Sequence, residues 1–267
     1  IYSEVDHQKR TVYPPEYDVT RRSYDPMHPC GRILYVVDAG KSDKGVASAW
    51  PVIGNFPTDR FDASRYHKID DALKAVNISN GIRTSIDITL PNMDTTAELW
   101  TITVENLTTV ERNIKMVPYC EWVLNGGLHD RFHTQYARLF PEMEYMCNLN
   151  AIFAWQKGTS SMGVLAAETG AEGFLTSRID FIGRARSIWK PRVFETFDFM
   201  DIRDTQPYPT FDPIGSLLLN AAVGPRGKKT IRLLLGYAAN RDKAINLVKT
   251  YLSPKPGTPV PESKARP

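Results

Sequence analysis

Strict alternation of apolar and polar residues is the feature of this sequence that most constrains its fold. Residues 84–90 and 100–105 both follow this two-residue period. Successive side chains of a β-strand point to opposite faces of the sheet, so the period predicts strands with one buried and one solvated face. The predicted buried positions of these two segments are Ile86, Ile88, Leu90, Trp100, Ile102 and Val104.

Similar apolar patterns recur along most of the chain. Residues 224–229 have the composition of a hairpin turn, and short links rich in Gly, Pro, Asn and Asp separate the other segments. Such runs favour a mainly β fold, a large antiparallel sandwich within one domain, over a parallel sheet with crossover helices. The further predicted strands are residues 32–38, 73–78, 113–120, 151–156, 162–167, 216–223 and 230–236.

One segment has helical spacing instead. Apolar residues form a stripe over Arg241–Leu252, Asn240 precedes it as a potential N-cap, and Pro254 follows it. We therefore predict one C-terminal helix within a sandwich domain spanning residues 30–252. Residues 1–29 show little periodicity and are predicted to be irregular, with at most one strand. Residues 253–267 contain five prolines, which indicates an extended linker within a longer polypeptide.

Composition excludes several classes of protein. The chain is 42% apolar and 24% charged, which is typical of a folded domain. The net charge of +3 is too small to indicate nucleic-acid binding. No apolar run is long enough to span a membrane, so a soluble chain is expected. Cys30, Cys120 and Cys147 form no C-x-x-C pair, which favours a reducing compartment and hence the cytoplasm.

Few motifs indicate chemistry. His129 and His133 have the spacing of a zinc-protease pair, but Asp130 stands where a glutamate is needed and glycines precede the pair, so no metal is expected. A basic stretch, residues 183–192, offers Arg184, Arg186 and Trp189 as possible phosphate or sugar contacts. Its arginines could equally pair with nearby carboxylates on the surface. The residues alone indicate no catalytic constellation and no cofactor.

Five segments carry a family resemblance: Gly81–Pro91, Ala97–Thr108, Val117–Trp122, Gly173–Arg184 and Leu234–Ala239. Together they resemble the amino-terminal sandwich of glycoside hydrolase family 94. This family includes cellobiose phosphorylase, β-1,2-oligoglucan phosphorylase and cyclic β-1,2-glucan synthase. Residues 133–145 look more like the branch that acts on β-1,2-glucans.

The resemblance implies a fold, a reaction and partners. The fold is a supersandwich similar to galactose-mutarotase-like domains. The parent enzyme would cleave a β-glucan oligosaccharide with inorganic phosphate and invert the anomeric centre, giving α-glucose 1-phosphate. The family places its acid and phosphate site in a downstream (α/α)6 barrel, so no catalytic residue is expected in this chain, and residues 253–267 would lead toward that catalytic domain. The resemblance also implies a homodimer. The loop Gly126–Arg138 would reach a sugar site through Arg131, His133, Gln135 and Arg138.

Two other functions fit a β-sandwich of this size. The chain could be a free-standing carbohydrate-binding module whose aromatic rings stack on sugars. It could also be a complete mutarotase-like enzyme, which needs a histidine and a carboxylate at a sugar ring. Affinity for oligosaccharides without another domain would favour the first alternative, and mutarotation above the buffer rate would favour the second.

Overall fold

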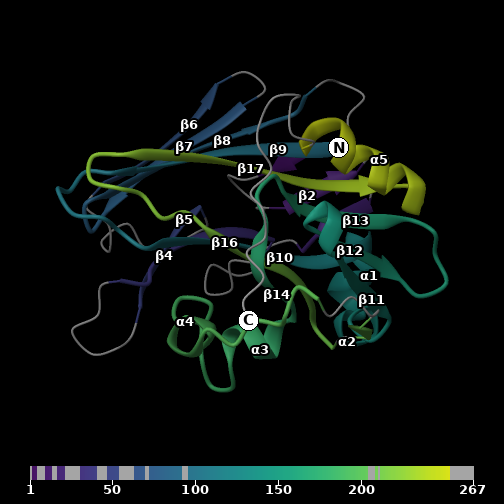
Figure 1. Cartoon of the computed structure of the whole chain (residues 1–267). Coiled ribbons are helices and arrows are strands. Elements are labelled where there is room, and N and C mark those ends of the chain that lie inside the picture. Colours follow the sequence, from purple (N-terminus) through teal and green to yellow (C-terminus); the bar gives the residue numbers. More distant parts are fainter. Residues whose placement is uncertain are drawn as a thin grey trace.

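Two antiparallel β-sheets stack face to face in this chain, and short helices lie on their outer sides (Figure 1). The structure is a computed structural model. It describes residues 2–4, 10–13, 17–21, 31–40, 47–53, 63–69, 72–91, 96–203, 208–209 and 211–252. The two stacked antiparallel sheets confirm the large sandwich that the two-residue period predicts.

The first sheet has eight strands arranged around the long strand β10 (Ile114–Gly126). One edge of β10 pairs with β16, and its other edge pairs with β4 in its first half and with β3 in its second half. The other strands of this sheet are β1 (Tyr2–Glu4), β2 (Arg10–Tyr13), β3 (Tyr17–Thr20), β4 (Arg32–Asp38), β5 (Ser48–Ile53), β14 (Ala171–Ser177) and β16 (Pro213–Asn220).

The second sheet has nine strands in the order β15-β11-β12-β13-β17-β9-β8-β7-β6. Their bounds are β6 (Ala63–Ile69), β7 (Ala72–Ser79), β8 (Ile82–Thr89), β9 (Ala97–Asn106), β11 (Pro141–Met146), β12 (Ala151–Gln156), β13 (Met162–Ala167), β15 (Tyr208–Pro209) and β17 (Lys228–Ala238). The helices are α1 (Gly127–Phe132), α2 (Thr134–Ala137), α3 (Arg178–Ile182), α4 (Val193–Thr196) and α5 (Arg241–Leu252), with a 3-10 turn η2 (Cys147–Leu149).

The main core lies between the two sheets and follows the predicted phase of the strands. Ile86, Ile88 and Trp100 are buried there with residues from the facing sheet. Strand β4 is buried on both faces, because its alternate residues Ile33 and Tyr35 pack under α3 and α4 on the outer side. The helices thus extend burial beyond the space between the sheets.

The C-terminal helix covers the outer face of the nine-stranded sheet and has the bounds that the sequence predicts. The Asn240 side-chain oxygen accepts a hydrogen bond from the Lys243 backbone N–H at 2.9 Å, which satisfies a free donor of the first turn. Arg241 donates two hydrogen bonds of 2.8 Å to Glu144 of β11. Figure 1 shows the helix lying beside β17 and β13.

Two expectations are corrected. Residues 1–29 are not irregular throughout, since they contain β1, β2 and β3, and β3 is joined to the middle of the sheet through β10. Strands of three or four residues are too short to display a period. Residues 224–229 do not close a hairpin, because β16 and β17 belong to different sheets and the turn carries the chain from one to the other. The predicted linker, residues 253–267, lies outside the described residues.

Among the helices of the described part of the chain, none is both long enough and apolar enough to cross a membrane.

Candidate functional site

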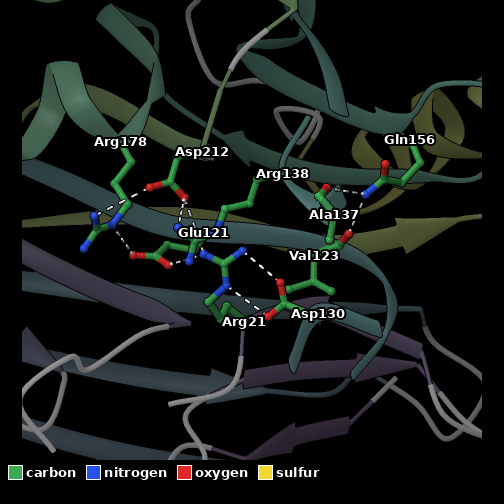
Figure 2. A network of polar contacts seen from close by, with 9 residues as sticks. All are labelled: Arg21, Glu121, Val123, Asp130, Ala137, Arg138, Gln156, Arg178 and Asp212. Carbon is green, nitrogen blue, oxygen red and sulfur yellow. Dashed lines mark hydrogen bonds and ion pairs between the residues drawn. The ribbon is translucent and has the colours of Figure 1, made fainter. Parts of the chain in front are cut away.

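A short helical segment, α1 and α2, connects the two sheets at the end of β10, and a buried group of charges lies beneath it (Figure 2). Arg21 stands at the centre. Its guanidinium donates to both carboxylate oxygens of Asp130 in α1, at 3.1 and 3.0 Å, and to Glu121 of β10 at 3.0 Å. All three side chains are almost completely buried.

The group extends from Glu121 toward α3. The second carboxylate oxygen of Glu121 accepts hydrogen bonds from Arg178 Nε at 3.0 Å and from the Tyr119 hydroxyl at 2.7 Å. Asp212 completes the group, with ion pairs to Arg21, Arg138 and Arg178 at 3.5, 3.1 and 3.6 Å. We call these six charged residues the ionic network: Arg21, Glu121, Asp130, Arg138, Arg178 and Asp212.

A neutral contact fixes the far end of the same segment. The side-chain nitrogen of Gln156 in β12 donates to the backbone oxygens of Val123 in β10 and Ala137 in α2, at 3.0 and 3.3 Å. Gln156 therefore ties the end of α2 to one strand from each sheet. Together with the ionic network, this contact holds the helical segment at both ends.

The protonation of Glu121 determines what chemistry the network can perform. Burial alone would raise the pKa of Glu121, but the charges of Arg21 and Arg178 and the hydrogen bond from Tyr119 outweigh it and hold the pKa below the ordinary value of 4.5. Burial and the charge of Glu121 raise the pKa of Tyr119 well above 10.0. The network consists of three arginines and three carboxylates, a balanced arrangement that fixes structure.

The predicted sugar-contacting residues lie on the segment that the network supports. His133 and Gln135 are exposed. Arg138 is partly buried and bound to Asp212. Arg131 belongs to α1, and its side chain is outside the description. The predicted loop is thus partly helical, because buried Asp130 and Ala137 anchor two short turns despite the preceding glycines.

The predicted contacts of the basic stretch are not brought together. Arg186 forms two hydrogen bonds of 2.9 Å with Glu195, as the surface-pairing alternative anticipates. Trp189 is partly buried and packs beside the aromatic cluster under the first sheet. Arg184 is exposed and lines a cleft beside α3.

Two histidines of the helical segment lie close together. The ring centres of His129 and His133 are 5.5 Å apart. In the described ranges, no three His, Cys, Asp or Glu side chains gather as metal ligands would. The pair alone is too small a donor set for a structural zinc site, which takes four ligands.

The model of the glycosyl hydrolase 94 supersandwich domain matches residues 14–254. This chain belongs to that family. The match includes every described element from β3 to α5, so the ionic network lies wholly within the supersandwich domain. A search among curated proteins finds no significantly similar sequence.

Solved structures are similar to the domain, and one of them, a bacterial glucoamylase, shares its fold. A bacterial glucoamylase complexed with acarbose is similar with a TM-score of 0.60 and 12% identity, over 92% of this chain and 31% of the glucoamylase. An aldose 1-epimerase of Escherichia coli K12 scores 0.40 at 8% identity, over 89% and 81%. A kojibiose phosphorylase from the human microbiome scores 0.37 at 10% identity, over 94% and 36%. The chain therefore spans about a third of the glucoamylase.

The supersandwich domain exposes large apolar side chains around its helical segment. Phe132 and Tyr136 are 71% and 63% exposed, and Phe211 beside the network is 63% exposed. The rings of Tyr136 and Phe140 are 5.9 Å apart. The segment thus combines a rigid base with an outer side that exposes both apolar rings and polar groups.

One residue of the ionic network has a visible signal in the sequence. Glu121 lies within the run that forms β10, where its neighbours on both sides are buried, and a carboxylate in such a place needs a partner. Its partners could not be found, because Arg21 is 100 positions away and Asp212 is 191 positions from Arg21. Glu121 and Trp122 are both buried within the sandwich.

Acid is expected to destabilise the supersandwich domain through Glu121. Its folded-state pKa lies below its ordinary value, so the unfolded chain takes up the proton first. The stabilisation is then complete above the unfolded-state pKa and is lost as the pH falls through the folded-state pKa. Urea unfolding at a series of acidic pH values should show a steeper loss of unfolding free energy in the natural domain than in Glu121→Gln. If both proteins lost unfolding free energy equally as the pH fell, the lowered pKa of Glu121 would be contradicted.

Proposed function

We propose that this supersandwich domain is the non-catalytic part of a glycoside phosphorylase that acts on β-glucans, with β-1,2-glucooligosaccharides as substrates. The observation that carries the proposal is the helical segment, which the ionic network holds against both sheets while His133 and Gln135 remain exposed. A rigid base with polar groups on its outer side suits a segment that contributes to a sugar site. Family membership supports the substrate class.

The protonation of the network supports a non-catalytic role. Cleavage of a glycosidic bond with inversion needs a carboxylic acid that carries a proton at neutral pH, and such an acid has a raised pKa. Glu121 has the opposite shift. Asp130 and Asp212 are held by arginines within hydrogen-bond or ion-pair distance. We therefore place the general acid and the phosphate site in a separate (α/α)6 domain of the parent enzyme.

In the parent reaction, phosphate would attack the anomeric carbon from the face opposite the leaving group. The bond from that carbon to the bridging oxygen breaks, a new bond to a phosphate oxygen forms, and the acid protonates the leaving oxygen. The products are α-glucose 1-phosphate and a glucan shortened by one residue. Arg131, His133, Gln135 and Arg138 are our candidates for sugar contacts at the edge of this site.

The apolar side chains of the helical segment support a partner surface. We propose that Phe132, Tyr136 and Phe211 pack against the catalytic domain or against the second subunit of a homodimer. Burying such side chains is worth roughly 25 cal/mol per Å² of apolar surface. Buried Cys120 and exposed Cys147 both carry free thiols, which fits a cytoplasmic enzyme.

The isolated chain is expected to release no glucose 1-phosphate from β-1,2-glucooligosaccharides and phosphate. The reason is that it lacks the proposed acid and phosphate site. Activity should appear when the same sandwich is joined to the helical domain of its parent. Phosphorolysis by the chain alone would contradict the proposal, and a mutarotation rate above that of buffer would favour the epimerase-like alternative.

In the complete enzyme, Gln135→Ala and His133→Ala are each expected to lower kcat/KM by about two- to tenfold, which is the effect of losing one hydrogen bond to substrate. The thermal midpoint should not change, because both side chains are exposed. Asn246→Ala is the matched control, since Asn246 is an exposed amide on α5, which covers the outer face of the nine-stranded sheet. If both variants have unchanged kinetics, the segment serves packing alone.

A further inference from the structure

A cleft of about 680 Å³ lies on the outer side of the eight-stranded sheet, between α3 and residues 196–200. Buried Leu175 of β14 forms part of its base. Sites for small molecules typically measure about 300–1,000 Å³. None of the residues that line the cleft belongs to the helical segment or to the ionic network. Figure 1 shows where α3 and α4 lie, below β14.

The first wall of the cleft is fixed by the backbone. The Gly183 N–H donates to Ile179 O at 2.8 Å and ends α3, and the Arg192 N–H donates to Ile182 O at 2.9 Å. Gly183 has a φ of +87°, a conformation that side chains disfavour, and a Cβ there would lie 2.8 Å from Arg192 Cβ. The glycine therefore lets Arg192 pack directly against the end of α3.

The opposite wall is fixed to the sheet. Met200 and Phe174 exchange backbone hydrogen bonds of 2.9 and 3.3 Å, which attaches residues 199 and 200 to β14 as a short bridge. A Cβ at position 173 would lie 2.6 Å from Phe199 Cβ, so Phe199 rests on the strand because residue 173 is a glycine. Both walls are thus preformed, and binding would need little reorganisation.

The polar groups of the cleft are available to a ligand. Arg184, Arg192, Asp180 and Asp198 all line it and are all exposed. In the part of the chain that the structure describes, the side chains of Arg184 and Arg192 have no hydrogen bond or ion pair, whereas nearby Arg186 is bound to Glu195. The cleft therefore presents guanidinium donors and carboxylate acceptors in equal number, with no net charge.

We propose that this cleft binds a neutral saccharide. Sugar hydroxyls donate and accept hydrogen bonds, which the two arginines and two aspartates match. The apolar C–H face of a pyranose can pack on Phe199 and the exposed side chain of Ile179. A phosphate would lie beside two aspartates and suffer like-charge repulsion. The site adds a second carbohydrate contact, separate from the helical segment, and it does not depend on the reaction of the parent enzyme.

Calorimetric titration of the chain tests this site. The probes are glucooligosaccharides with β-1,2, β-1,4 and α-1,4 linkages, so that the result does not depend on the linkage proposed above, and inorganic phosphate. We expect saturable binding of at least one oligosaccharide and none of phosphate. Arg184→Ala and Arg192→Ala should each weaken that binding about tenfold, the effect of losing a charged hydrogen-bond donor. Asp198→Asn should weaken it by a smaller factor.

Two matched variants show whether the effect is local. Arg226→Ala removes an exposed arginine from the turn before β17, and Arg186→Ala removes the paired arginine next to the cleft. Both should bind the oligosaccharide as the natural chain does, with unchanged circular dichroism in all variants. The proposal is overturned if no oligosaccharide binds, if phosphate binds instead, or if Arg184→Ala and Arg192→Ala retain full affinity.

Discussion

Replacing Glu121 by glutamine is expected to lower the unfolding free energy of the domain by roughly 3–5 kcal/mol, the usual cost of removing one partner from a buried ion pair. The side chain is 2% exposed, so water cannot replace the lost charge. Among the described residues, Arg21 would keep Asp130 and Asp212 as anionic partners, and Arg178 would keep Asp212. Urea unfolding followed by far-UV circular dichroism measures the change.

Glu105→Gln is the matched control for this variant. Glu105 pairs with Arg83 and Lys228 on the solvated face of β9, where both cations are largely exposed. Exposed pairs contribute about 0–1 kcal/mol, so the control should remain within that range. A Glu121→Gln variant as stable as Glu105→Gln would show that the ionic network does not stabilise the fold. It would then have to act only in positioning the helical segment.

The sequence predicted the elements of this fold whose apolar residues form a regular local pattern. Strands β12 and β13 have the predicted bounds because turn residues and polar links flank each short apolar run. The helix α5 has its predicted bounds because an apolar stripe, an N-cap and a following proline agree with one another. In each case the information lies within about a dozen neighbouring residues.

Features that depend on distant residues could not be predicted in this way. The alternation in β16 and in β17 is the same whether the two strands pair with each other or face each other across the core. The turn between them has the composition of a hairpin in either case. Which strands pair with each other is decided by packing between distant residues. The alternation within one strand does not reveal its partner.

The candidate site shows the same limit. The family resemblance predicted sugar contacts within residues 126–138. The structure places His133 and Gln135 on the exposed side of that segment. The residues that hold the segment come from β10, from α3 and from the ends of β3 and β16, far apart in the chain. Charged side chains scattered singly along a sequence carry no sign that they converge.

Trp100→Ala is expected to cost roughly 3–5 kcal/mol of unfolding free energy, as large-to-small changes of buried aromatic residues do. The ring is 2% exposed and lies in the core between the sheets. Its Nε1 donates to Glu98 Oε2 at 3.1 Å, and the Arg32 guanidinium lies 5.8 Å from the ring centre. The variant therefore leaves a cavity, and it also removes a donor from a carboxylate that has no access to water.

A second variant separates the two contributions. Trp100→Phe keeps most of the apolar volume but cannot donate to Glu98, so its loss of stability should be smaller than that of the alanine variant. Trp155→Ala provides the control, because Trp155 is only partly buried and lies on the outer side of β12. Urea unfolding should rank the variants Trp100→Ala, Trp100→Phe, Trp155→Ala in order of decreasing loss. If Trp155→Ala proved the most damaging, the main core would not lie between the two sheets where the alternation of β9 places it.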